Sequence, residues 1–280
     1  MTVIEDLIYG RFNVEGVIEE LLFSQPVQRL RAVHQGGAIF LFDSRLSHTR
    51  FDHSLGVFWL VREYGGSISE QIAALLHDVS HTAFSHVGDH VFHYPAEDYH
   101  EHIFEKIIQD SDIPTILKKY GFEDALNNFG NHTLLERSSP ELCADRIDYI
   151  LRDSFHAGLT TVKAIENFLT NLTTDGTRFL CTSNHADQWI RNLSALLSDK
   201  YFNKPEFLFV NQSFADLLRT AISENKLQEQ DLLLTDFEVL EKINNHYEHA
   251  LADIVNLVGF SNFKAEAAIS RIKERNLKKR

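Results

Sequence analysis

The chain has 280 residues, of which 44% are hydrophobic and 24% charged, and its formal net charge is −13 at pH 7. This composition is typical of a soluble globular protein, and the acidic balance argues against a general nucleic-acid binder. Two distant cysteines do not suggest a disulfide framework, and no run approaches the ~20 apolar residues that a membrane span requires. We therefore expect a cytoplasmic protein with no membrane partner.

Apolar residues recur at helical spacing through most of the chain, which predicts a mostly α-helical protein. The apolar run Ala38 to Phe42 is an exception and predicts a short strand or extended turn. The helices expected in the first half cover residues 1–8, a segment opened by Pro26, residues 53–63 and residues 68–81.

The second half contains three further signals. The stretch "SSPELCADRIDYILRDSFHAG" has Ser, Pro and Glu at its start and Gly at its end, which predicts a helix from Ser139. Asp175-Gly176 lies between two β-prone runs and predicts one small hairpin. Thr235 and Glu238 have the spacing of a capping box, so another helix is expected to begin there.

The short apolar run "LLHDVSHTAFSH" contains three histidines and an aspartate. Polar groups that leave water without a partner are costly, so a buried cluster of this kind needs something to bind. On a helix His77 and His81 share a face, and Asp78 lies about 100° away from His77. Imidazole combined with carboxylate suits Zn, Fe or Mn better than Mg or Ca. The alternative is a pair of hydrogen-bonded core histidines beside a helix-terminal Asp.

Two other segments supply matching groups. His53 begins another expected helix, and Asp145 lies in the helix that is expected from Ser139. Together the segments offer two imidazoles and two carboxylates, with positions left open for water and substrate. The candidate ligands of a divalent metal ion are therefore His53, His77, Asp78 and Asp145.

The order of "HTRFDHSLGV", "LLHDVSHTAFSHVGD", "YHEH" and "ADRIDYILRD" resembles the HD-domain phosphohydrolases, most closely their dNTP triphosphohydrolase branch. The resemblance covers roughly residues 25 to 160. It implies an all-α fold, namely an HD-domain helical bundle with a small β-hairpin and an appended helical C-terminal lobe. The catalytic core would span residues 1–160, and the hairpin and helices of residues 161–280 would pack on it. One divalent ion of the Fe, Mn, Zn or Ni class is implied, with Mg left open.

The resemblance also assigns roles to individual residues. It implies that His53, His77, Asp78 and Asp145 bind the metal. Four catalytic groups would surround the phosphate under attack: His81, His86, Asp89 and His100. Arg50 would contact a substrate phosphate, and the sugar contacts would be Gln35, Tyr149 and Asp153. These chemistries are reasonable, because histidine can protonate a leaving oxygen and arginine can offer a fork of donors to phosphate. Other histidines we interpret as surface or packing residues, namely His34, His48, His90, His93 and His102.

Two departures from the branch bear on the substrate. Gly36 stands where the branch usually has Leu, so we expect a roomier sugar side and weak discrimination between ribose and deoxyribose. The stretch "EFLFVNQSFADLL" has no cation where triphosphatases have a Tyr-x-His/Lys cluster. We expect hydrolysis of a small-molecule nucleotide or phosphate ester, in the manner of a (d)NTP triphosphohydrolase. The alternatives are a phosphomonoesterase or 5′-nucleotidase, a di-iron HD oxygenase and an idle binding module, and a homo-oligomer is left open.

Overall fold

The computed structural model describes residues 1–127 and 131–263, and this part of the chain is mostly helical, which confirms the expected all-α class. The elements of the first half are β1 (Thr2–Asp6), β2 (Gly10–Val14), α1 (Gly16–Leu22), α2 (Gln25–Arg29), η1 (Leu30–Ala32), α3 (Ile39–Phe42), α4 (Arg50–Glu63), α5 (Ile68–Leu76), α6 (Val87–Phe92), α7 (Tyr99–Gln109) and α8 (Ile113–Tyr120). Those of the second half are α9 (Ala144–His156), α10 (Val162–Leu169), β3 (Leu172–Thr174), β4 (Phe179–Cys181), α11 (Asn184–Leu197), η3 (Ser198–Phe202), α12 (Pro205–Ser223), η4 (Glu229–Leu233), α13 (Asp236–Val255) and η5 (Phe260–Asn262).

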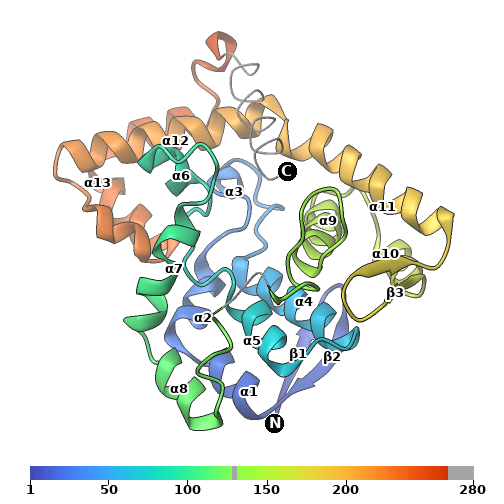
Figure 1. Cartoon of the computed structure of the whole chain (residues 1–280). Coiled ribbons are helices and arrows are strands. Elements are labelled where there is room, and N and C mark those ends of the chain that lie inside the picture. The colour runs from blue at the N-terminus through green and yellow to red at the C-terminus, as the bar shows by residue number, and fades with distance from the viewer. Residues whose placement is uncertain (128–130, 264–280) are drawn as a thin grey trace.

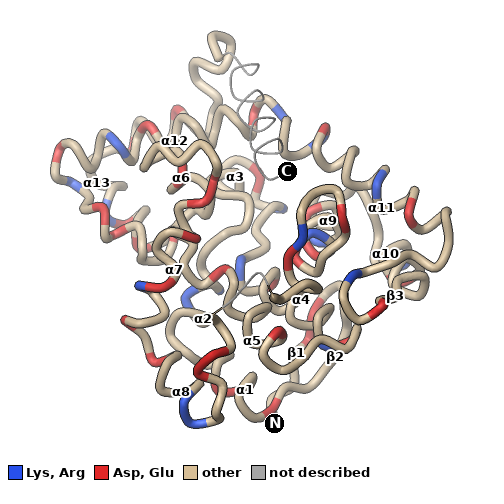
Figure 2. Tube along the Cα trace, viewed as in Figure 1, with Lys and Arg blue, Asp and Glu red and all other residues tan. Residues whose placement is uncertain are grey.

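Helix α4 lies at the centre of the fold and packs against α5 and α9 (Figure 1). Its residues are buried on almost every side, and the buried set includes the polar residues Arg50, His53 and Ser54. Gly56 allows the close approach of α9, because a Cβ at this position would lie 1.9 Å from Oδ1 of Asp148. Acidic and basic positions are interspersed along α9 (Figure 2).

Two main groups of buried apolar side chains form the interior. The larger group joins the N-terminal hairpin, α1, α4, α5 and α9 with α10 and α11. The second group lies between α6, α12 and α13, and α12 crosses the top of the molecule in Figure 1. Ile165 and Ile190 belong to the larger group. The division into residues 1–160 and 161–280 stays a prediction.

The first eight residues are not a helix, contrary to the sequence prediction. Strand β1 pairs antiparallel with β2, and Ile4 faces Phe12 across the hairpin. The Asp6 carboxylate accepts hydrogen bonds from the backbone N–H groups of Ile8 and Tyr9, at 2.8 and 2.9 Å. This side-chain turn competes with a helix, and the β-branched residues before it favour the strand.

The run from Ala38 to Phe42 was expected to be extended, but Ile39–Phe42 form the short helix α3. The backbone N–H of Ala38 donates to Oδ1 of Asn211 on α12, at 2.8 Å. Phe40 stacks on the ring of His34 with a centroid separation of 3.6 Å. Contacts with a distant segment therefore override the local β preference.

Two helix boundaries also differ from the prediction. Helix α5 ends at Leu76, so residues 77–81 form a loop in which Arg29 binds the backbone oxygens of Val79 and His81. Helix α9 begins at Ala144 and not at Ser139. The N–H groups of its first two residues, Ala144 and Asp145, donate to the backbone oxygens of Leu134 and Leu135 at 2.7 and 3.3 Å.

Other predictions are confirmed. Strands β3 and β4 form the hairpin around Asp175-Gly176, and Thr235 and Glu238 form the capping box that begins α13. Pro26 lies in the first turn of α2. Over residues 1–127 and 131–263, no helix combines the length and the apolar character needed to cross a bilayer.

Candidate metal centre

Four side chains from three segments converge where α4, the end of α5 and the first turn of α9 meet. Nε2 of His53 lies 3.0 Å from Oδ1 of Asp145 and 3.4 Å from Nε2 of His77. Asp78, in the loop after α5, places Oδ1 3.4 Å from Nε2 of His77 and Oδ2 3.8 Å from Nε2 of His53. The four predicted ligands therefore lie together, although His77 and Asp78 follow α5 and do not share a helix face with His81.

These separations fit a bound divalent ion. Bonds of about 2.1 Å to nitrogen and oxygen ligands place neighbouring donor atoms roughly 3.0–3.4 Å apart around one ion. His53, His77 and Asp145 each offer a donor atom within 4.8 Å of the other two. Two imidazoles with carboxylates suit the Zn, Fe and Mn class.

The other nitrogen of each imidazole is already engaged. Nδ1 of His53 donates to Oδ2 of Asp148 at 2.7 Å, and Nδ1 of His77 donates to the backbone oxygen of Ala74 at 2.8 Å. Both rings are thereby oriented with Nε2 toward the centre, which is how metal-binding histidines are commonly held. Asp148 is itself buried and bonded twice to Arg152, at 3.0 Å each.

The electrostatics of the centre favour positive charge. Burial disfavours a charged His53, yet its hydrogen bonds to Asp145 and Asp148 raise its pKa to about 10. Burial also opposes ionisation of Asp78, but Arg50 and His77 hold the pKa of this carboxyl well below its usual range. Ionised carboxylates thus surround the point that a cation would occupy.

Arg50 is buried beside the centre. Its Nη1 donates to Oδ2 of Asp78 at 2.7 Å, and its Nε donates to Oγ of Ser85 at 2.9 Å. Ser85 in turn donates to the backbone oxygen of His34 at 2.6 Å. The guanidinium is therefore held rigidly next to the predicted metal ligands.

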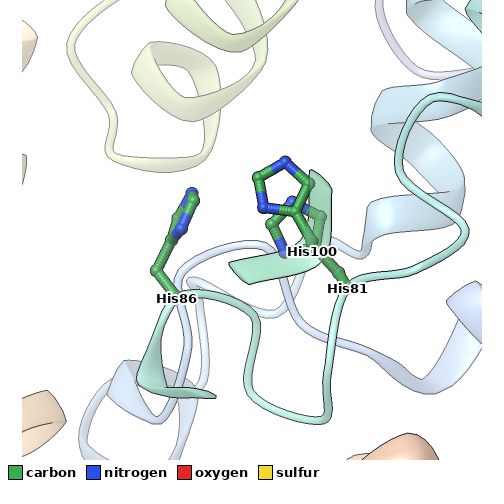
Figure 3. Close-up of side chains that lie close together, drawn as sticks. All are labelled: His81, His86 and His100. Atoms are coloured by element: carbon green, nitrogen blue, oxygen red, sulfur yellow. The ribbon is translucent and has the colours of Figure 1, made fainter. Parts of the chain in front are cut away.

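The three predicted catalytic histidines, His81, His86 and His100, lie close together (Figure 3). His81 and His100 stack with centroids 3.9 Å apart, and His86 approaches His81 edge-on at 5.0 Å. Nε2 of His81 lies 3.2 Å from Oδ1 of Asp78, which connects this group to the metal centre. The loop after α5 supplies His81, the residue before α6 is His86, and α7 supplies His100.

Asp89 orients His86. Its Oδ2 accepts from Nδ1 of His86 at 3.0 Å, while its Oδ1 accepts from the backbone N–H of Tyr99 at 2.9 Å. The His86 side chain is 32% exposed, whereas Asp89 is buried. This pair is the arrangement expected of a general acid that meets substrate on its open side.

The three residues predicted to contact the sugar have different surroundings. Oδ1 of Asp153 accepts from Nε2 of His48 at 2.7 Å, and the half-buried Tyr149 has its ring 6.1 Å from that of Phe202. Oε1 of Gln35 is buried and has no hydrogen-bond partner.

The space beside Gly36 is filled, contrary to the sequence expectation of a roomier pocket. A Cβ at Gly36 would lie 2.5 Å from Oη of Tyr201 and 2.5 Å from Cδ1 of Ile39. Side chains from η3 and α3 therefore take the place that a larger residue 36 would occupy.

Several supporting residues were missed by the sequence prediction. His34 and His48 are not surface or simple packing residues, because both are buried and bonded to carboxylates. Asp236, at the start of α13, accepts from His34 N–H at 2.9 Å and from Phe84 N–H at 2.6 Å. Asp236 therefore connects the segment before Gln35 with the segment before His86.

Asp148 was also missed by the sequence prediction. The signal that could have found it is its spacing of four residues from Arg152 on α9.

Comparison with known proteins agrees with this geometry. The HD domain family profile matches residues 50–153. YdhJ of Bacillus subtilis is 45% identical over 239 residues, which is 85% of this chain and 74% of that protein. The metal-dependent phosphohydrolase cns2 of Cordyceps militaris is 40% identical over 171 residues, 60% of this chain and 50% of the relative. Bovine deoxynucleoside triphosphate triphosphohydrolase SAMHD1 is 31% identical over 145 residues, 43% of this chain and 24% of that protein.

The fold is also found in a solved structure. A hypothetical protein from Aquifex aeolicus superposes with a TM-score of 0.72 at 22% identity, covering 90% of this chain and 74% of the other. The chain thus spans about three quarters of YdhJ but only half of cns2. It belongs to the HD-domain superfamily of metal-dependent phosphohydrolases. The protein is accordingly a hydrolase.

Proposed function

We propose that this chain hydrolyses the phosphate esters of nucleotides with one divalent ion held by His53, His77, Asp78 and Asp145. The observation that carries the proposal is the convergence of these donor atoms at 3.0–3.8 Å, with two imidazoles already oriented by their second nitrogens. A divalent ion held there would lower the pKa of a water molecule towards about 7 and would neutralise phosphoryl charge.

Residues of the chain can bind the phosphate and protonate the leaving oxygen. Arg50, fixed by Asp78 and Ser85, offers positive charge to a phosphate oxygen. Burial lowers the pKa of His100 to about 3, so this ring is neutral at pH 7 and cannot act as the acid. His86, half-exposed and oriented by Asp89, is our candidate for protonating the leaving oxygen.

We propose a (d)NTP triphosphohydrolase-like reaction as the first candidate. It is supported by the order of the sequence motifs and by the relation to bovine SAMHD1. A phosphomonoesterase is the second candidate, because the stretch "EFLFVNQSFADLL" has no cation and the two lysines that precede it have partners of their own. Lys200 pairs with Asp199 at 2.8 Å, and Lys204 lies over the Phe207 ring at 4.2 Å.

One experiment tests the function and separates the two candidates. The metal content of the purified protein is measured, and the protein is then incubated with matched nucleoside mono- and triphosphates. Release of intact triphosphate supports the first candidate, and inorganic phosphate from monophosphates supports the second. Absence of metal-dependent release from every nucleotide would refute the proposal.

A further inference from the structure

The two residues before His86 have an unusual backbone conformation. Phe84 and Ser85 are both left-handed, with φ of 59° and 51°, although neither is a glycine. A Cβ atom crowds the following carbonyl in this conformation, which therefore persists only where surrounding contacts impose it. His86 follows directly, and its ring lies beside those of His81 and His100 (Figure 3). The position of our candidate acid thus depends on what holds this turn.

Asp236, at the start of α13, binds the first residue of the turn. Its Oδ1 accepts from the backbone N–H of Phe84 at 2.6 Å, and its Oδ2 accepts from the backbone N–H and from Nδ1 of His34, at 2.9 and 2.8 Å. The carboxylate is fully buried. Hydrogen bonds from backbone N–H groups to a carboxylate are among the strong ones in proteins. One side chain therefore ties the turn to the segment around His34.

Further hydrogen bonds complete this connection. Oγ of Ser85 donates to the backbone oxygen of His34 at 2.6 Å, and the backbone oxygen of Ser85 accepts from Oγ1 of Thr82 at 3.0 Å. The N–H of Ala83 donates to Leu232 O at 2.7 Å, so the chain that leads into α13 also contacts this loop. The turn is fixed by partners that lie far away in the sequence.

His86 needs two constraints to meet a substrate in one defined place. Asp89 orients its ring through Nδ1, at 3.0 Å, whereas the turn sets the position and direction of its Cα–Cβ bond. A displacement of about 1 Å is enough to remove much of the effect of a catalytic group. The backbone that precedes His86 therefore matters as much as the partner of its ring.

We propose that Asp236 is a positioning residue of the catalytic site, whose carboxylate holds the left-handed turn at Phe84 and Ser85 and thereby places the imidazole of His86. The inference rests on the proposed function, in which His86 protonates the leaving oxygen. It extends that step to a residue of α13, which lies outside the matched HD domain.

The activity test is a double-mutant cycle between positions 236 and 86. Asp236→Asn keeps the shape of the side chain, but an amide accepts hydrogen bonds at only one of its two terminal atoms and cannot serve Phe84 and His34 together. We expect kcat to fall by roughly 10- to 100-fold, with KM and metal content unchanged. In a His86→Gln background the same substitution should lower kcat by less than about threefold, because the group that it positions is already gone.

Glu238→Gln is the matched control, because this carboxylate also lies in the first turn of α13 but bonds to Thr235. We expect it to leave kcat unchanged. Equal losses from Asp236→Asn with and without His86 would show a general effect on the fold and would overturn the proposal.

Thr82→Val provides a second variant, because it removes the hydroxyl that binds Ser85 O and leaves α13 intact. If Asp236→Asn does not fold, this variant decides. A loss of kcat that requires His86 supports the placing of His86 by the turn, and the absence of such a loss contradicts it.

Amide hydrogen exchange of metal-loaded protein keeps the inference separate from the proposed function. Peptides that cover residues 82–87 should exchange at least about tenfold faster in Asp236→Asn than in the wild type, while peptides from α4 should not change. If this is seen but no nucleotide is hydrolysed, Asp236 still holds the turn and only the proposed function fails. If residues 82–87 keep their wild-type exchange, the inference fails whatever the activity.

Discussion

Asp148 and His53 are joined by a buried hydrogen bond of 2.7 Å between Oδ2 and Nδ1, and the same carboxylate is bonded to Arg152. Nη2 of Arg152 also lies 3.0 Å from Oδ2 of Asp6, at the end of the N-terminal hairpin. The orientation of a predicted metal ligand is thereby tied to a strand that lies outside the matched HD domain.

We expect Asp148→Asn to weaken metal binding by about 10- to 100-fold, the usual effect of removing a group that orients a ligating histidine. Metal affinity is measured by competition with a chelator. Asp153→Asn is the matched control, because this buried carboxylate on the same helix bonds to His48 and not to a predicted ligand. An unchanged affinity in Asp148→Asn would contradict the role of Asp148.

Replacing His86 by Gln should leave the metal bound and lower kcat by roughly 10²–10⁴, the range for a lost general acid. The physical reason is that His86 faces solvent on one side and is oriented by Asp89 on the other. Metal analysis and steady-state kinetics are made on the same sample. His90→Gln, in the helix α6 that follows His86, is the control. Loss of metal in His86→Gln would mean that His86 is a ligand.

Protonation of His100 should destabilise the protein in acid. Burial lowers its pKa from 6.5 to about 3 in the folded state. The unfolded chain therefore binds the extra proton first, so the stability is complete above pH 6.5 and is lost as the pH falls toward 3. Between pH 7 and pH 5 this amounts to about 2 kcal/mol. Urea unfolding at pH 7 and pH 5 measures the free energy of unfolding. The decrease in this free energy from pH 7 to pH 5 should be smaller in His100→Gln than in the wild type, by about 2 kcal/mol. Equal losses in the two proteins would argue against the lowered pKa.

Substitution of Gly36 by Ala should destabilise the fold by about 1–3 kcal/mol, because the new methyl group overpacks the space held by Tyr201 and Ile39. Urea unfolding measures the change. In a Tyr201→Phe background part of the loss should be recovered, since the phenol oxygen at 2.5 Å is gone. If the two substitutions are additive, the predicted contact between positions 36 and 201 is wrong.

The sequence predicted the candidate metal ligands where short motifs contain residue types that bind metal ions. His53, His77, Asp78 and Asp145 could be selected together because the HD-like motifs stand in a fixed order. The end of α5 at Leu76 could not be predicted, because it accompanies Arg29 binding backbone oxygens some fifty residues away. The same limit applies to α3, because the N–H of Ala38, the residue before this helix, donates to Asn211 on α12.

Tyr201 had no sequence signal of its own. It follows a helix of ordinary amphipathic pattern, and only the fold brings it beside Gly36. The sequence did mark Gly36 as unusual, but a missing side chain does not tell which neighbour fills its place. Such compensation depends on packing between distant segments, which periodicity and spacing do not record.

Asp236 has a consequence for how the protein is made. Its carboxylate bonds the backbone at His34 and Phe84, across 202 and 152 residues of chain respectively. A chain emerging from the ribosome has all four predicted ligands long before it reaches Asp236. We therefore expect the backbone around His34 and Phe84 to reach its final arrangement only after Asp236 has been synthesised and α13 has docked.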